Sequence, residues 1–160
     1  SANKKDDKFL HTKVTPLDFK KADKKALKEL IKQMRIIMKE ANGVGLSANQ
    51  IGLNLRLFVA QVPDAKNNLK FYAVLNPEFS KLSKEQLDLD EGCLSVPETY
   101  GHVARHTGVT LEGQNAEGKK IKIKAWGLLA HVFQHEVDHL NGILFTDKAK
   151  NLHKLNIKNN

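Results

Sequence analysis

The sequence predicts an α+β fold in which antiparallel sheets pack around a central helix, with a second helix near the N-terminus. Two helical patterns, over residues 23–41 and 127–140, flank a long series of short strand-like segments separated by turn residues. The chain has 160 residues, of which 41% are hydrophobic and 28% charged, the size and composition of one globular domain. We expect a single catalytic domain over residues 1–160, with residues 1–8 flexible and residues 146–160 forming a basic tail.

The first helix is expected to begin after Asp23, a favourable N-cap residue, and to end near Ala41, before Asn42 and Gly43. Its apolar residues recur at helical spacing on one face: Leu27, Leu30, Ile31, Met34, Ile37 and Met38. The glycine-rich segment that follows, residues 43–52, is predicted to be a turn from its glycines alone, although its small residues would also let the backbone approach another element closely.

Residues 53–126 are predicted to be mostly antiparallel sheet, because short segments rich in branched or alternating apolar residues recur there. The expected strands are 55–62, 71–75, 86–90, 103–105, 109–113 and 119–124, with a hairpin connection at 114–118. The helix from Gly127 to Leu140 has apolar residues on nearly every side, which is typical of a buried helix, and Gly142 closes it.

The composition also bears on the compartment and the partners. There is no apolar signal region at the N-terminus and no segment near the roughly 18 apolar residues that span a bilayer. The single cysteine cannot form an internal disulfide, so we expect the cytoplasm or the interior of an organelle and not secretion. The net charge of +8 comes from scattered lysines, which suits loose association with RNA. No basic stripe is interleaved with aromatic residues, so a solvated surface is the preferred interpretation; no membrane and no sequence-specific nucleic acid is expected.

The second helix carries the sequence H-E-V-D-H at residues 135–139. Residues four apart lie on the same face of a helix, so His135 and His139 can bind one metal ion. Glu136 then lies beside the open position of the metal and outside the coordination shell, where a general acid/base is needed. The spacing is the H-E-x-x-H signature.

A catalytic site of the zinc type normally has three protein ligands, so one ligand must come from elsewhere. Phe145 occupies the position where a metzincin has a further histidine, and Asp147 is the only acid after His139 that a thermolysin-like site could use. His131 and His139 are about 12 Å apart along the helix axis, too far to share one ion. Cys93 is the remaining donor, and a thiolate with two imidazoles is an accepted catalytic set.

Three motifs together resemble the polypeptide deformylase family: G-V-G-L-S-A-N-Q at residues 43–50, E-G-C-L-S-V-P at 91–97 and Q-H-E-V-D-H-L-N-G at 134–142. Their order and their spread over most of the chain make the resemblance specific. It implies a hydrolase that removes the N-formyl group from the formylmethionine of nascent polypeptides and releases formate. It also gives the basic surface a candidate partner, the ribosome.

The resemblance further implies the roles of individual residues at the metal. Cys93, His135 and His139 would hold one divalent ion with a water in the fourth position. The family uses Fe(II), and zinc, nickel or cobalt also suit these ligands. Glu136 would take the proton of that water and pass it to the leaving amine.

The substrate contacts are likewise implied by the resemblance. The Gln50 amide and the backbone N–H of Leu94 would stabilise the oxyanion, and the backbone of Gly45 would align the substrate main chain. The expected side-chain pocket consists of Val44, Leu128, His131 and Val132. Family members commonly have an aliphatic residue in place of His131, so we expect a more polar pocket. Tyr100 stands where some members have a substrate-facing arginine.

Two other interpretations use the same residues. A metallopeptidase of the H-E-x-x-H type would hydrolyse an internal amide, but the cysteine ligand and its loop disfavour it. A binding protein with a structural metal would close the site with four protein ligands, often several cysteines, and would leave Glu136 without a role. Glu91 and Arg105 are expected either to form a salt bridge behind the Cys93 loop or to be independent surface charges.

Overall fold

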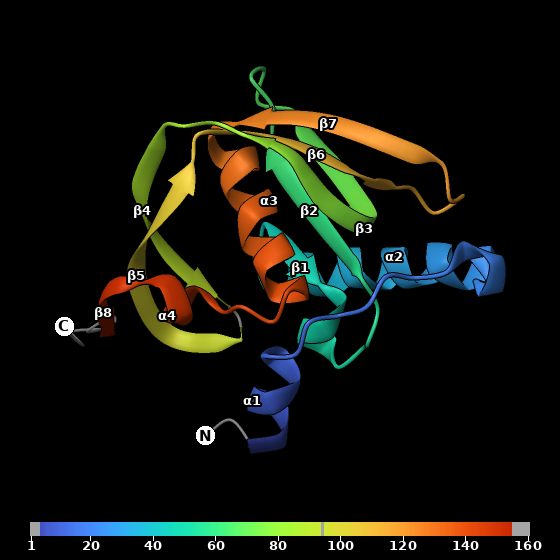
Figure 1. The fold of residues 1–160 in the computed structure, drawn as a ribbon, viewed down its shortest axis with the longest axis horizontal. Coiled ribbons are helices and arrows are strands. Elements are labelled where there is room, and N and C mark those ends of the chain that lie inside the picture. The colour runs from blue at the N-terminus through green and yellow to red at the C-terminus, as the bar shows by residue number, and fades with distance from the viewer. Residues whose placement is uncertain (1–3, 94, 155–160) are drawn as a thin grey trace.

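The computed structural model describes residues 4–93 and 95–154, without the side chains of residues 4, 96–98 and 154. Its strands form two antiparallel sheets, one with the order β1-β2-β3-β6-β7 and one with the order β4-β5-β8 (Figure 1). The strands are β1 Gly45–Ser47, β2 Leu57–Pro63, β3 Leu69–Leu82, β4 Gln86–Cys93, β5 Val96–His106, β6 Gly108–Gln114, β7 Lys120–Trp126 and β8 Lys150–Lys154. The predicted α+β class is confirmed.

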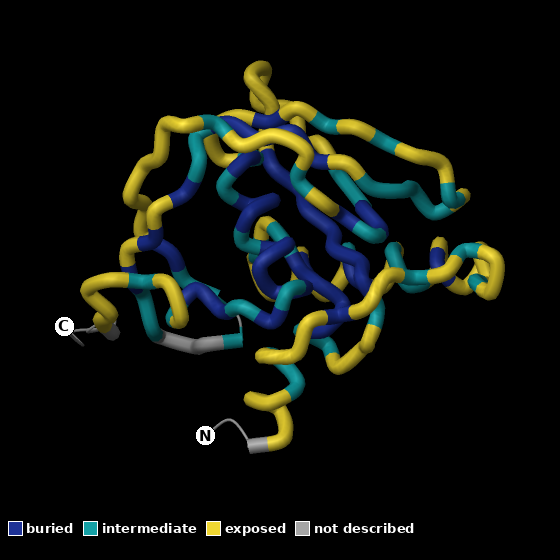
Figure 2. Tube along the Cα trace, in the orientation of Figure 1, coloured by how far each residue is buried: buried dark blue, intermediate teal, exposed yellow. Residues whose placement is uncertain are grey.

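Helix α3 lies in the middle of the fold, between the two sheets (Figure 1), and its trace is largely buried (Figure 2). The helices are α1 Lys4–Leu10, η1 Phe19–Lys21, α2 Lys24–Glu40, η2 Ala48–Ile51, α3 Gly127–Leu140 and α4 Phe145–Lys148. Both predicted helices are therefore present with nearly the expected bounds. Among the residues that the structure describes, none of these helices is long and apolar enough to cross a membrane.

Helices α2 and α3 cover opposite faces of strand β2. Successive side chains of a strand point to opposite faces, and here Phe58 and Ala60 belong to the apolar cluster around α3. Leu57 and Val59 belong to the second cluster, which contains the buried residues of α2. This part of the large sheet is therefore covered on both sides.

The rotation of α3 about its axis is fixed by its apolar face. Phe133 is fully buried, and its ring centroid lies 5.5 Å from that of Phe58 and 5.4 Å from that of Tyr72. Burial of an aromatic or aliphatic side chain of this size stabilises a fold by about 1.5–3 kcal/mol. With Phe133 directed at the large sheet, the adjacent face of the helix presents His135 and His139 to strand β4.

In the N-terminal segment, α1 begins at Lys4, inside the stretch 1–8 that was expected to be flexible, and residues 1–3 are outside the described part of the chain. The segment that follows α1 is attached to the end of α3. The N–H of Val14 donates to the carbonyl of Leu140 at 2.8 Å, and the Arg56 guanidinium donates to the same carbonyl at 3.1 Å. The basic tail also has structure: β8 pairs with β5, with His102 opposite Lys150, whereas residues 155–160 are outside the described part of the chain.

Residues 43–52 are not a simple turn. Gly45 pairs with Ala60 of β2, so residues 45–47 form an edge strand of the large sheet. The turn residue is Gly52, which has φ of 82° and caps η2. This arrangement places Gln50 on a short, rigid helix next to the metal-binding motif.

Candidate active site

Three donor atoms meet where α3 passes the end of β4. The Nε2 atom of His139 lies 3.0 Å from Nε2 of His135 and 3.1 Å from Sγ of Cys93, and the three atoms are all within 4.8 Å of one another. Two nitrogens bound to the same tetrahedral zinc ion are roughly 3.3 Å apart, given bonds of 2.0–2.1 Å. The donor set therefore fits a single ion, and the structure brings Cys93 from β4 to the two histidines of α3.

Glu136 lies beside these donors and is almost completely buried. Its Oε1 is 4.0 Å from Nε2 of His135, and its Oε2 has no hydrogen-bond partner in the described part of the chain. Burial, the largest cause, together with the negative charge of Glu91 raises the pKa of Glu136 to about 7, although His135 and Arg105 act in the opposite direction. A carboxyl group with this pKa and one free oxygen is suited to accept and return a proton near neutral pH.

The two histidines have opposite electrostatic environments. Burial and the neighbouring His135 lower the pKa of His139 to about 3, which keeps its imidazole neutral, as a metal ligand must be. Burial also lowers the pKa of His135, but hydrogen bonds with Cys93 and Glu91 outweigh it and raise that pKa to about 10. A metal ion must displace this proton, so binding of the ion is coupled to proton release.

Glu91 is the centre of a buried hydrogen-bond network behind the donors. It accepts hydrogen bonds from Arg105 at 2.7 and 3.1 Å and from Nε2 of His131 at 3.0 Å, and it also contacts Nδ1 of His135. The predicted salt bridge between Glu91 and Arg105 is therefore present and buried. Burial raises the pKa of Glu91, but the hydrogen bonds from His131, His135 and Arg105 outweigh this and hold it well below its usual range. The network orients His135, since a carboxylate on Nδ1 directs Nε2 toward the ion.

The amide of Gln50 is fixed in orientation by Ser47. Its Oε1 accepts two hydrogen bonds of 2.9 Å, from the N–H and from the hydroxyl of Ser47. Its Nε2 must then face the other way, where it lies 3.4 Å from Sγ of Cys93 and 3.1 Å from Oγ of Ser95. Gln50 thus presents N–H donors to the candidate metal centre. Leu94, the other expected oxyanion donor, lies outside the described residues.

Gly45 brings the backbone of β1 against the carboxylate of Glu136. A Cβ atom at this position would be 2.7 Å from Oε1 of Glu136, so no larger residue fits without displacing that group. From the sequence, the backbone of Gly45 was expected to align the substrate main chain; its contact with Glu136 was not foreseen.

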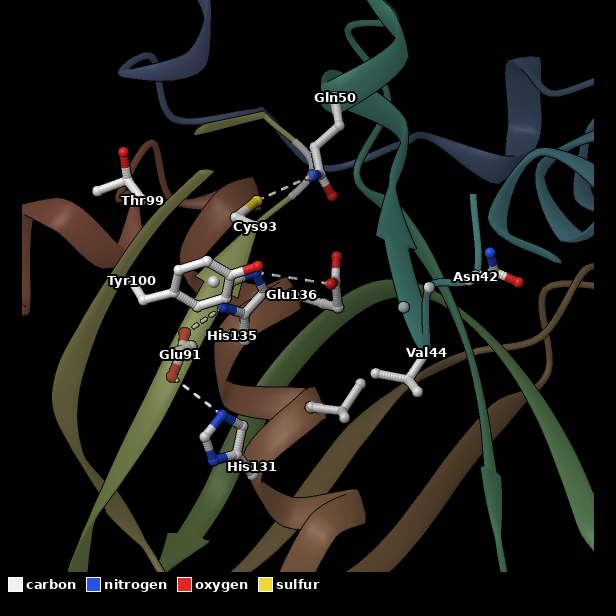
Figure 3. Close-up of a pocket in the computed structure, with 14 residues that line it drawn as sticks. Asn42, Val44, Gln50, Glu91, Cys93, Thr99, Tyr100, His131, His135 and Glu136 are labelled. Carbon is white, nitrogen blue, oxygen red and sulfur yellow. Dashed lines mark hydrogen bonds and ion pairs between the residues drawn. The ribbon is translucent and has the colours of Figure 1, made fainter. Parts of the chain in front are cut away.

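A cavity of about 440 Å³ opens beside the donors (Figure 3). Of the four expected pocket residues, Val44, His131 and Val132 line it. Leu128 does not: it is 53% exposed on the first turn of α3, one turn beyond the end of the cavity. Five further lining residues were not foreseen, namely Asn42, Gly43, Glu91, Gly92 and Thr99. The first four could have been suspected, because they lie in or next to the 43–50 and 91–97 motifs. Thr99 is on β5, outside both motifs.

Gln134 and Asp138, two further polar side chains of the 134–142 motif, attach α3 to β5. The Gln134 side chain accepts from the N–H of His106 and donates to its carbonyl, both at 2.8 Å, as a neighbouring strand would. Asp138 contacts Arg105 and lies 3.0 Å from the ammonium group of Lys148. Neither side chain is among the donors, and both hold the helix in place.

Known proteins share this arrangement. The family model of polypeptide deformylases matches residues 3–155. The peptide deformylase of Carboxydothermus hydrogenoformans is 48% identical over 124 residues, which cover 78% of each chain. The solved structure of a probable peptide deformylase from Synechococcus phage S-SSM7 is 40% identical, with a TM-score of 0.80 and coverage of 88% of this chain and 93% of that one. A Met-Ala-Ser-bound peptide deformylase from Acinetobacter baumannii is 32% identical, with a TM-score of 0.80 and coverage of 88% and 91%. The match over nearly the whole chain agrees with the geometry of the site, and the chain belongs to the polypeptide deformylase family.

Proposed function

We propose that the cavity beside α3 binds the formylmethionine at the start of a nascent polypeptide and that Glu136 carries out the proton transfers of its deformylation. The chain is a hydrolase of the peptide deformylase family, which removes the N-formyl group from newly made polypeptides. The observation that carries the residue assignment is the free, buried oxygen of Glu136 next to a cluster of one thiol and two imidazoles.

Cys93, His135 and His139 would hold the metal ion. When bound, a divalent ion supplies Lewis acidity and lowers the pKa of a water molecule, so that a nucleophile is available near neutral pH. Glu136 accepts the proton released from that water at its free oxygen and donates it to the leaving amine nitrogen, as the bond between the formyl carbon and the nitrogen breaks. Formate and a free N-terminal methionine result.

Gln50 would stabilise the developing negative charge on the formyl oxygen. Its Nε2 is already directed at the centre by Ser47, so little reorganisation is needed during the reaction. The loss of one such donor lowers the rate of related acyl-transfer enzymes by about 100-fold or more. The backbone N–H of Leu94 is proposed as the second donor on the basis of the family motif.

The substrate main chain would lie along β1. This strand is at the edge of the large sheet, and an edge strand can accept an extended peptide through backbone hydrogen bonds. The related structure from Acinetobacter baumannii contains Met-Ala-Ser, a peptide of the proposed product type. The methionine side chain would enter the cavity between Val44 and Val132, with His131 on its wall.

The family implies a single metal ion, and we propose Fe(II) as that ion. The proposed compartment is the cytoplasm or the interior of an organelle, where the thiol of Cys93 stays reduced. Loose association with the ribosome through the basic surface would bring the enzyme to its substrates. Metal analysis after anaerobic purification, paired with activity, tests the choice of ion: zinc in the active fraction would contradict Fe(II).

The decisive assay compares formyl-Met-Ala-Ser with acetylated and unblocked Met-Ala-Ser. We expect release of formate from the first peptide and no cleavage of the other two. Glu136→Ala should retain the metal and lose turnover. Cleavage of an internal amide would support a metallopeptidase instead, and unchanged turnover of Glu136→Ala would contradict the role of the carboxylate.

A further inference from the structure

The outer face of strand β7 carries a basic stripe that ends in an aromatic residue. Residues Lys120, Lys122, Lys124 and Trp126 alternate with Ile121, Ile123 and Ala125 along this strand. The isoleucines and the alanine face the core around α3, so the lysines and the tryptophan point away from it. No basic stripe with an aromatic residue was predicted from the sequence, because the expected strand over 119–124 ended before Trp126, whereas β7 extends to it.

No helix in the described part of the chain covers this face. Helix α2 packs on the same side of the sheet, but its buried residues contact β1, β2 and β3. Over β6 and β7 the side chains of Glu112, Lys122, Lys124 and Trp126 are exposed. The uncovered face lies across the sheet from α3 and from the catalytic cavity.

Trp126 is held in a defined position although it is 70% exposed. Gly108 is its partner on β6, and a Cβ at Gly108 would be 3.0 Å from Cδ1 and 3.2 Å from Nε1 of the indole. The edge of the ring therefore rests on the glycine backbone and most of its surface faces solvent. An exposed aromatic surface fixed in this way loses little side-chain entropy when a flat partner stacks on it.

Three lysines line a groove next to Trp126. The groove, of about 540 Å³, is lined by Lys81, Lys122, Lys124 and Trp126, together with Ser80, Ser83, Gly108, Val109, Thr110 and Glu112. Among the described residues, no carboxylate is within ion-pairing distance of these three lysines. Among the described residues that line the groove, Glu112 is the only acid; it lies opposite Lys122, and three lysines against one carboxylate leave the lining basic. Lys122 and Lys124 are alternate residues of β7, which recur about every 6.8 Å along a strand. Lys81 is on β3 and lies across β6 from Lys124, because both pair with Thr110.

We propose that this groove, made by β3, β6 and β7, binds single-stranded nucleic acid without sequence specificity. The three lysines would neutralise successive phosphates, and a base would stack on Trp126, the combination that single-strand-binding surfaces use. A membrane surface fits less well, because the lining offers one indole and little other apolar area for insertion. An acidic peptide would use the lysines but would leave the exposed indole without a partner.

The test uses the fluorescence of Trp126, which is the only tryptophan of the chain and therefore reports on this groove alone. The metal-loaded protein is titrated with a mixed-sequence 12-nucleotide RNA, the DNA of the same sequence, the RNA duplex, polyglutamate and phosphatidylglycerol vesicles. Quenching by the single strands is expected, with an affinity that falls about 20-fold between 50 and 200 mM salt. That value follows from three phosphate contacts at a slope of about 0.7 each.

Matched variants separate the groove from general charge attraction. Lys81→Gln combined with Lys122→Gln and Lys124→Gln should remove most of the affinity and of the salt dependence, measured by anisotropy of labelled RNA. The control removes the same charge from exposed positions of α2, by Lys25→Gln, Lys32→Gln and Lys39→Gln, and should bind as the original protein does. Trp126→Ala should bind roughly tenfold or more weakly, and Trp126→Phe should retain most of the affinity.

Deformylation of formyl-Met-Ala-Ser and the melting temperature are followed in every variant, and all should turn over the peptide as the original protein does. A difference between RNA and DNA would identify the preferred single strand. Equal losses in the two triple variants would overturn the proposal, since the attraction would then be diffuse. It would also be overturned by tighter binding to polyglutamate or to the vesicles than to the single strands, or by the absence of quenching.

Discussion

Gly45→Ala should displace the carboxylate of Glu136 and leave the three metal-binding side chains where they are. The new Cβ would lie 2.7 Å from Oε1 of Glu136, whereas ordinary contacts begin at 3.4 Å, so the carboxylate must move by roughly 0.7 Å. It yields more readily than the paired backbone of β1 because it is the end of a side chain. A displacement near 1 Å in a catalytic group lowers the rate by about 100-fold, so we expect kcat to fall by tens of times to about 100-fold.

The assay is steady-state hydrolysis of formyl-Met-Ala-Ser, with metal content measured on the same samples. The metal should stay bound, because Gly45 contacts none of the three donors, and KM should change less than kcat. Gly113→Ala is the control: its Cβ would be 2.6 Å from Val74, a similar clash far from the cavity, and should lower the melting temperature without changing kcat of the folded protein. An unchanged kcat in Gly45→Ala, or metal loss in parallel with activity, would refute the reasoning.

Four further outcomes are expected. Cys93→Ala should lose the metal, measured by elemental analysis, and chelation should abolish turnover until a divalent ion is restored; a fully loaded Cys93→Ala would contradict the ligand assignment. The pKa of Glu136 is raised to about 7 from the usual 4.5, so the folded state takes up a proton that the unfolded state releases. The free energy of unfolding therefore falls as pH rises from 4.5 to 7, by about 3 kcal/mol in total. Urea unfolding of the metal-free protein should therefore show Glu136→Gln to be more stable at pH 8 and not at pH 4, and equal stability at pH 8 would refute this. The depressed pKa of Glu91 has the opposite sign: its contribution is present above pH 4.5 and is lost as pH falls below it. Glu91→Gln should therefore unfold more easily at pH 7, by about 3–5 kcal/mol because Arg105 loses a buried partner, and the difference should shrink in acid. His131→Ile should increase the preference for norleucine and leucine relative to methionine, measured as kcat/KM, and unchanged preferences would contradict a polar pocket wall.

The helices could be predicted from sequence because their determinants are local. The bounds of α3 follow from its apolar pattern and the glycine after it, and Asp23 caps α2 as expected, accepting a hydrogen bond from the N–H of Ala26. The H-E-x-x-H spacing likewise fixed the geometry of two donors in advance, because both lie on one helix. Cys93 could be inferred only by elimination, and the structure brings it 3.1 Å from His139.

The missed elements depend on partners that are distant in the sequence. Strand β1 contains Gly45 and has little strand propensity; it is extended because it pairs with β2. Strand β8 is rich in polar residues and is extended because it pairs with β5. Leu128 was predicted to line the side-chain pocket and does not. The sequence indicates on which face of α3 it lies, but not how far along the helix the cavity extends. The basic stripe beside Trp126 was overlooked because the expected strand over 119–124 ended before that residue.

The hydrogen bonds between the Leu140 carbonyl, Val14 and Arg56 give the first residues of the chain an influence on the metal. They anchor the terminal turn of α3, the turn that contains His139. Proteolytic trimming beyond Val14 would remove one of these bonds and leave Arg56 as the remaining donor to the Leu140 carbonyl, so the turn would be held less firmly and retention of the ion would weaken, although every ligand would still be present. The segment that follows α1 thus acts as a remote support for metal affinity.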